Sequence, residues 1–163
     1  MTDDSFDFGS AVSAVYSLQP EDDEPLPLDV MAASETGRIP VEQSPALMFV
    51  RRTAHDLERG EISWEDFQDR MERLYNKSAK QLEQFSQEIQ SMVSQVDEKS
   101  LQSAVALQGG LTSIVEGCDR LLECADDDRE EIKAGLALIE SGFYEIDHAE
   151  AQAHEGLSGA EQA

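Results

Sequence analysis

Apolar side chains recur at every third or fourth position over most of the chain from about residue 63 to residue 154. Only residues three or four apart lie on one face of an α-helix, so this spacing predicts helices. The steps mostly alternate between three and four, a heptad seam that is typical of helices packed along one another. No strand-like alternation of comparable length occurs. We therefore expect an all-α protein whose helix–helix contacts involve Phe67, Met71, Leu74, Leu82, Phe85, Ile89, Met92, Leu107, Leu111, Ile114, Leu121, Ile132, Leu136, Ile139 and Phe143.

A shorter apolar stripe precedes this region. Leu47 and Leu57 lie on its apolar face, and the stripe follows Pro45 and ends before Gly60. Glycine is common just past a helix end. A first helix is therefore predicted between Pro45 and Gly60.

The segment from Ile62 to Phe67 has the composition of a capped helix start. Ser63 is expected to accept a hydrogen bond from the backbone amide three residues on, and Asp66 stands at the acidic position of a capping box. Ile62 and Phe67 are spaced as a hydrophobic staple. The stretch from Leu57 to Phe67 resembles the helix–turn–helix start of small SHOCT-type domains. With its flanking residues, the region of resemblance covers about twenty residues. That resemblance implies two helices and a turn and no function, and here the motif is internal and runs on into a long helix.

The architecture depends on where the chain reverses its direction between the long helices. Paired glycines inside a helix cost about 1 kcal/mol each, so Gly109 and Gly110 are the first candidate for a turn. Residues 63–107 and 111–155 would then be the two arms of an antiparallel helical hairpin or coiled-coil bundle. The alternative break is the polar cluster that ends at Ser100, because the seam keeps its phase across the two glycines.

A second interruption is predicted at residues 126–128, which are three consecutive aspartates. Acidic side chains are favourable at the positive end of a helix dipole. A further helix is therefore expected from about residue 129 to residue 153. Residues 46–155 would form the helical domain, and residues 156–163, which are small and polar, would form a frayed tail.

Residues 1–45 are acidic and contain all five prolines of the chain. A segment with few apolar residues and a high net charge cannot bury enough surface to offset the entropy of ordering, so this segment is expected to be a disordered tail. Phe6, Phe8 and Tyr16 place apolar groups near its start. They form a candidate linear motif that docks on a partner, and the alternative is an ordinary disordered terminus.

The formal net charge of −23 at pH 7 favours some classes of binding partner and disfavours others. Nucleic acids and anionic membranes would be repelled, whereas a basic protein would be attracted. The longest apolar run, residues 134–139, is too short to span a bilayer. Cys118 and Cys124 provide no disulfide framework, which favours a reducing, cytoplasmic location.

Glu145 and His148 offer the chemical pattern that comes nearest to a metal site, a Glu-x-x-His spacing. Di-metal helical bundles need two such motifs and further inward carboxylates, and the sequence contains one such motif.

We expect no cofactor and no catalytic residue. The expected function is that of a helical interaction protein, self-associating or part of a larger assembly. The reason is that the apolar face is wider than two arms can cover, as indicated by Val93, Val105, Val115 and Leu122. The alternatives are an acidic chaperone-like binder of a basic or secreted client and a metal-dependent helical-bundle enzyme.

Overall fold

The computed structural model describes the backbone of residues 41–162 and the side chains of residues 41–152. This part of the chain is helical and contains no strand, as the sequence predicted. Of the tail predicted over residues 1–45, residues 1–40, with the candidate motif of Phe6, Phe8 and Tyr16, lie outside the described residues. Residues 41–45 form η1, the cap residue Ser44 and the first residue of α3. The helices are η1 (Val41–Gln43, a 3-10 turn), α3 (Pro45–Glu58), α4 (Trp64–Met92), α5 (Glu98–Glu123) and α6 (Arg129–Gln162).

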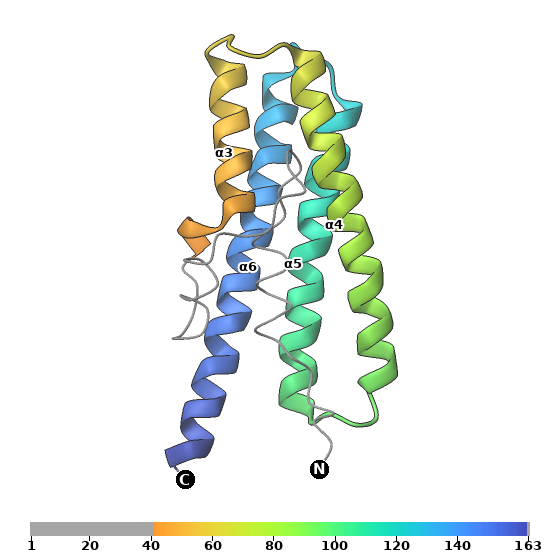
Figure 1. Ribbon diagram of the computed structural model, residues 1–163, viewed down its shortest axis with the longest axis vertical. Coiled ribbons are helices and arrows are strands. Elements are labelled where there is room, and N and C mark those ends of the chain that lie inside the picture. The colour runs from red at the N-terminus through yellow and green to blue at the C-terminus, as the bar shows by residue number, and fades with distance from the viewer. Residues whose placement is uncertain (1–40, 163) are drawn as a thin grey trace.

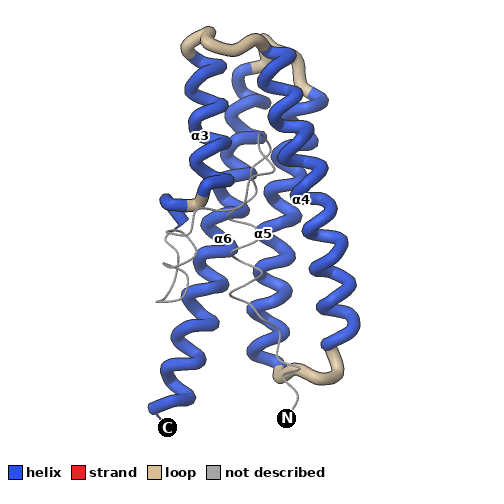
Figure 2. The backbone as a smooth tube through the Cα atoms, viewed as in Figure 1, coloured by secondary structure: helices blue, strands red, loops and turns tan. Residues whose placement is uncertain are grey.

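The four α-helices form an up-and-down bundle in which each helix is antiparallel to its neighbours (Figure 1). α3 packs against α4 and α6, and α5 packs against α4 and α6, so the helices occupy four corners in the order α3, α4, α5, α6. Short connections join consecutive helices (Figure 2). The α4–α5 and α5–α6 contacts are the extensive ones.

The described chain reverses at three connections, between α3 and α4, between α4 and α5, and between α5 and α6, and none of them lies at the glycine pair. α4 ends at Met92 and α5 begins at Glu98, so the turn lies next to the polar cluster that ends at Ser100. α5 then continues without interruption through Gly109 and Gly110. The predicted hairpin turn at the glycines is therefore wrong, and the alternative break near Ser100 is the correct one.

Side chains at the helix starts explain where the chain turns. The backbone N–H of Asp66 donates to Ser63 Oγ at 3.0 Å, as predicted for the start of α4. The N–H of Ser100 donates to Asp97 Oδ1 at 2.7 Å, so Asp97 caps α5. Hydrogen bonds from the Ser100 side chain and then from its backbone N–H lower the pKa of the Asp97 carboxyl, because they favour the charged form. Gly60, with φ of 72°, supplies the left-handed residue just after the end of α3, in the α3–α4 connection.

The second interruption lies where the three aspartates predicted it. α5 ends at Glu123 and α6 begins at Arg129. α6 ends at Gln162 and not near residue 153, so this helix is longer than predicted. The fraying expected after residue 156 stays a prediction.

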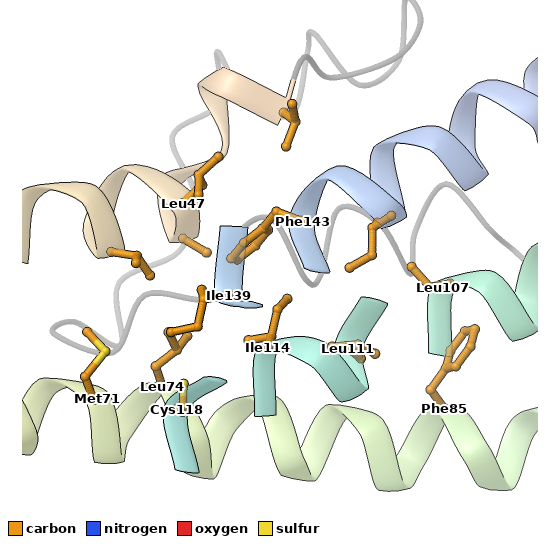
Figure 3. Packing of buried hydrophobic residues seen from close by; sticks show 14 of the residues in the cluster. Leu47, Met71, Leu74, Phe85, Leu107, Leu111, Ile114, Cys118, Ile139 and Phe143 are labelled. Carbon is orange, nitrogen blue, oxygen red and sulfur yellow. The ribbon is translucent and has the colours of Figure 1, made fainter. Parts of the chain in front are cut away.

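The predicted seam forms the core of the bundle (Figure 3). Cys118, which the heptad pattern places on the seam, has no exposed surface, and burial raises the pKa of its thiol to about 12. Met92 is half-buried, and Leu82, Ile132 and Leu136 are partly buried against the core. The remaining predicted seam residues are buried: Phe67, Met71, Leu74, Phe85, Ile89, Leu107, Leu111, Ile114, Leu121, Ile139 and Phe143.

Glycines bring α5 and α6 into direct backbone contact. A Cβ atom on Gly110 would lie 2.7 Å from the carbonyl oxygen of Gly142, and a Cβ atom on Gly117 would lie 2.6 Å from the carbonyl oxygen of Gly135. Neither distance leaves room for a side chain, so these positions require glycine for steric reasons. Both pairs belong to one antiparallel register, because seven residues forward in α5 correspond to seven residues back in α6. Gly110, which was predicted to break the helix, is therefore a packing residue of the α5–α6 contact.

Candidate interaction surfaces

The first candidate surface arises because α3 is short. α3 has 14 residues and α4 has 29, which correspond to about 21 Å and about 43 Å at the helical rise. Figure 1 shows that α3 ends near the middle of the bundle, while α4, α5 and α6 continue beyond it. We call the position that lies in line with α3, beyond its N-terminal end and between α4 and α6, the open corner.

Core residues continue along α4 and α6 at the level of the open corner. On α4, Phe85 and Ile89 extend the apolar stripe that α3 covers further up, and Phe85 points toward Leu107 of α5 (Figure 3). On α6, Ile146 and Ala149 extend the corresponding stripe. These side chains are buried, and Ile146 lies against Gly110 of α5.

The second candidate surface is the end of the α4–α5 hairpin. Val93 lies directly after α4 and is 53 % exposed, and Val105 lies in the first half of α5 and is 51 % exposed. We call these two residues the valine pair of the hairpin end. Val115, which was predicted to widen the seam in the same way, is half-buried, and Leu122 packs partly against the core. Among the described residues, Met48 of α3 and Tyr144 of α6 are also exposed, and on the α4–α5 hairpin the exposed large apolar side chains are those of the valine pair.

A polar link joins α3 to α6 on the outer face of the bundle. Arg51 Nε lies 2.6 Å from Glu140 Oε1, and Arg51 Nη2 donates to the Tyr144 hydroxyl at 3.0 Å. The hydrogen bonds to Glu140 and Tyr144 raise the pKa of the Arg51 guanidinium. The Arg51 and Glu140 side chains are 45 % and 41 % exposed, so solvent screens this ion pair and it is expected to stabilise the bundle by at most about 1 kcal/mol. It links α3 to α6.

The residues of the candidate metal pattern lie on the surface. Glu145 and His148 are both exposed, and the closest described polar contact of His148 is with Gln152. In di-metal bundles the ligands project into the core, so this orientation does not suit such a site. Within the described residues, no group of three His, Cys, Asp or Glu side chains is arranged to hold a metal ion.

The two cysteines differ in their surroundings. Cys118 is enclosed in the core, whereas Cys124 is half-buried at the end of α5, and neither forms a disulfide. Burial is the main cause that raises the pKa of the Cys124 thiol, and the nearby Asp128 carboxylate adds to it. A thiol with a raised pKa is a poor nucleophile. Neither cysteine is therefore placed as a reactive centre.

Comparisons with protein-family models, with curated proteins and with solved structures gave no match for this chain. The short likeness to SHOCT-type domains at the α3–α4 connection is thus unsupported by any family model. Among the helices of the described region, none combines the length and the apolar character that crossing a membrane requires.

Proposed function

We propose that this protein is a non-enzymatic helical interaction protein that binds other helical protein surfaces, including copies of itself, through the hairpin end. The observation that carries this proposal is the exposure of the valine pair, Val93 and Val105, in a bundle whose other seam residues are buried or partly buried. Apolar side chains that remain exposed beside a polar rim are a common feature of protein contact sites.

The charge around the valine pair favours a particular kind of partner. Asp97 and Glu98 follow the turn, Glu88 precedes it, and Lys99 is the basic residue nearest to them in the sequence. All four are exposed. A contact surface with apolar residues inside an acidic rim attracts a partner that carries basic groups around an apolar patch. The net charge of −23 supports the same preference, and it favours, as a second candidate, an acidic chaperone-like role toward a basic client.

Self-association remains part of the proposal because the repulsion between exposed acidic groups is screened over about 8 Å at physiological ionic strength. Two copies would therefore associate more readily as the salt concentration rises, whereas a complex with a basic client would weaken. The free, unpaired thiols of Cys118 and Cys124 are in keeping with a reducing, cytoplasmic location, which we propose for the protein.

The experiment compares two double variants of the full chain. Val93→Glu with Val105→Glu places two charges on the valine pair. Gln90→Glu with Gln102→Glu adds the same two charges at exposed polar positions of α4 and α5. Because all four positions are exposed or polar, circular dichroism is expected to show unchanged helicity for both variants.

Light scattering coupled to size-exclusion chromatography, over a range of protein and salt concentrations, provides the readout for self-association. Titration with a purified basic helical peptide that carries an apolar face provides the readout for the client role. We expect the valine variant to lose self-association or peptide binding, and the glutamine variant to retain it. If the native chain is monomeric at all concentrations and does not bind the peptide, or if both variants behave alike, the proposal is wrong.

A further inference from the structure

The exposed face of α3 is basic, although the net charge of the protein is −23. From Pro45 to the cap residue of α3, the exposed side chains are those of one methionine, three arginines, one histidine and one glutamate: Met48, Arg51, Arg52, His55, Glu58 and Arg59. We call these residues the basic face of α3. The exposed charged side chains of α4 and α5 are mostly acidic, and those of the described part of α6 are balanced. Among the described side chains, α3 alone therefore presents an excess of positive charge to solvent.

Met48 adds apolar surface to this face. Its side chain is 47 % exposed, and it precedes Arg52 by four residues, so the two side chains are neighbours on one side of the helix. Arg51 is engaged in the ion pair with Glu140. Arg52, in contrast, forms no ion pair with another described residue. The basic face thus offers an exposed apolar side chain with an uncompensated positive charge beside it.

The hairpin end has the complementary composition. Its valine pair is exposed, and the exposed charged side chains around it are three acidic ones and one basic one: Glu88, Asp97, Glu98 and Lys99. An apolar centre with an acidic rim matches an apolar centre with a basic rim, because contact removes the apolar groups from water and brings opposite charges together. α3 lies along the half of the bundle that is far from the hairpin end (Figure 1). The two surfaces of one chain therefore cannot meet each other, and their pairing requires two copies.

We propose that the hairpin end of one copy docks on the basic face of α3 in a second copy, with the valine pair against Met48 and the acidic rim beside Arg52. This inference rests on the function proposed above and names the surface that the hairpin end recognises. Because the contact joins two different surfaces, each pair of copies leaves one hairpin end and one basic face free. Assembly therefore continues beyond two copies unless the rotation between neighbours closes a ring.

The opposite charges act within the contact, whereas the net charge of −23 acts between whole chains as they approach. Salt screens the repulsion between the approaching chains over about 8 Å at physiological ionic strength. The expectation that salt promotes self-association is therefore unchanged, and the variants below are compared at one salt concentration.

The test combines two double variants of the full chain. Met48→Glu with Arg52→Glu, the α3 variant, makes the basic face acidic and leaves the hairpin end intact. Val93→Glu with Val105→Glu, the valine variant, places charges on the hairpin end and leaves the basic face intact. All four positions are exposed, so circular dichroism is expected to show unchanged helicity.

A third double variant, Asn76→Glu with Lys80→Glu, is the matched control for the α3 variant. It makes the same change in net charge at two exposed positions that are also four residues apart, on α4. Light scattering coupled to size-exclusion chromatography gives the mass of each chain alone and of an equimolar mixture of the α3 variant and the valine variant.

We expect the native chain and the control to self-associate. The α3 variant and the valine variant should each remain monomeric, with dissociation constants about tenfold or more above the native value. In their mixture, the valine variant supplies an intact basic face and the α3 variant supplies an intact hairpin end. The mixture should therefore form a dimer with one copy of each variant, and this dimer cannot grow further.

The proposal is overturned if the α3 variant self-associates like the native chain, or if the mixture of the two variants stays monomeric. In either case, loss of self-association in the valine variant would leave the function proposed for the hairpin end standing. Equal loss in the control would mean that added negative charge alone prevents association, which also contradicts the proposal. A native chain that is monomeric at every concentration overturns this inference, and the titration with the basic peptide then decides separately whether the hairpin end binds a client.

Discussion

Replacing Gly110 by alanine tests the close α5–α6 contact, and the neighbouring Gly109 provides an internal control. A Cβ atom at residue 110 would lie 2.5 Å from Ile146 Cγ1 and 2.7 Å from the carbonyl oxygen of Gly142. The Ile146 side chain can rotate, but the Gly142 carbonyl moves only if the two helices separate. A Cβ atom at residue 109 would meet its nearest neighbour, Glu145 Oε2, at 3.9 Å, which is an ordinary contact distance.

The two substitutions share the same effect on helix propensity, which favours alanine over glycine by about 1 kcal/mol in a helix interior. Overpacking of a close helix contact costs about 1–3 kcal/mol, and only Gly110→Ala incurs this cost. We therefore expect Gly109→Ala to raise the free energy of unfolding by up to about 1 kcal/mol. Gly110→Ala should lie about 1–3 kcal/mol below Gly109→Ala, and thus close to or below the native chain.

The assay is urea unfolding followed by far-ultraviolet circular dichroism, with the slope of the transition checked for each variant. A slope that stays constant shows that the midpoints report stability and not a change in compactness. Equal midpoints for the two variants, or a higher midpoint for Gly110→Ala, would refute the backbone contact between α5 and α6. Such a result would mean that residue 110 faces open space, as it would in a turn between two helices.

Four further predictions concern single side chains of the bundle. Ser63→Ala should lower the free energy of unfolding by about 1 kcal/mol in urea titrations, because the start of α4 loses its cap, and unchanged stability would argue against that cap. Ser78→Ala should leave stability unchanged or increase it, because the buried Ser78 hydroxyl has no hydrogen-bond partner in the described region; a loss above about 1 kcal/mol would contradict this. An alkylating thiol reagent should modify Cys124 in the folded protein and reach Cys118 only on unfolding, so equal labelling by mass spectrometry would show an accessible core. Because its pKa is lowered in the folded state, the Asp97 carboxylate stabilises the folded protein above the ordinary carboxyl pKa of 3.8, and this contribution is lost as the pH falls through the folded-state pKa. In Asp97→Asn, the free energy of unfolding should therefore fall less steeply as the solution is acidified. An unchanged acid dependence of the free energy of unfolding would exclude this contribution.

The core of this protein could be predicted from its sequence because helical periodicity is a local property. Leu107, Leu111 and Ile114 were placed on one face by their spacing alone, and all three are fully buried. The start of α4 was predictable for the same reason, since the cap of Ser63 involves only residues within one helical turn. Neither result requires knowledge of how the helices are arranged in space.

The glycines were misread because their local cost and their packing role point in opposite directions. Helix propensity treats Gly110 as a breaker, but the contact with α6 outweighs that preference once the two helices meet. A signal for this role was present in the sequence: Gly110 and Gly117 are seven residues apart, and so are Gly135 and Gly142. Glycines one heptad apart stay on one face of a helix, which is the pattern of a close helix contact and not of a turn.

The candidate surfaces could be predicted only in part. Val93 and Val105 were identified as surplus apolar residues, and both are exposed. Val115 has the same periodicity but is half-buried, because its burial depends on which helices lie beside α5. The open corner follows from the short length of α3 relative to α4, and its position between α4 and α6 depends on the cyclic order of the helices. That order is a property of tertiary packing, which the spacing along a single helix does not contain.

The reversal of the chain between α4 and α5 determines the positions of both the hairpin end and the open corner. The distance between one residue of α4 and one residue of α5 tests where this reversal lies. Spin labels at the exposed positions Glu72 and Asp119 would lie on neighbouring antiparallel helices, at the level where Gln68 bonds to the Leu122 carbonyl. Helix axes in contact are about 8–10 Å apart, so pulsed electron paramagnetic resonance should give a short distance, below about 25 Å, when the native cysteines are replaced. A chain that reversed at the glycine pair would place the same labels about 40 Å apart, and that result would contradict the bundle.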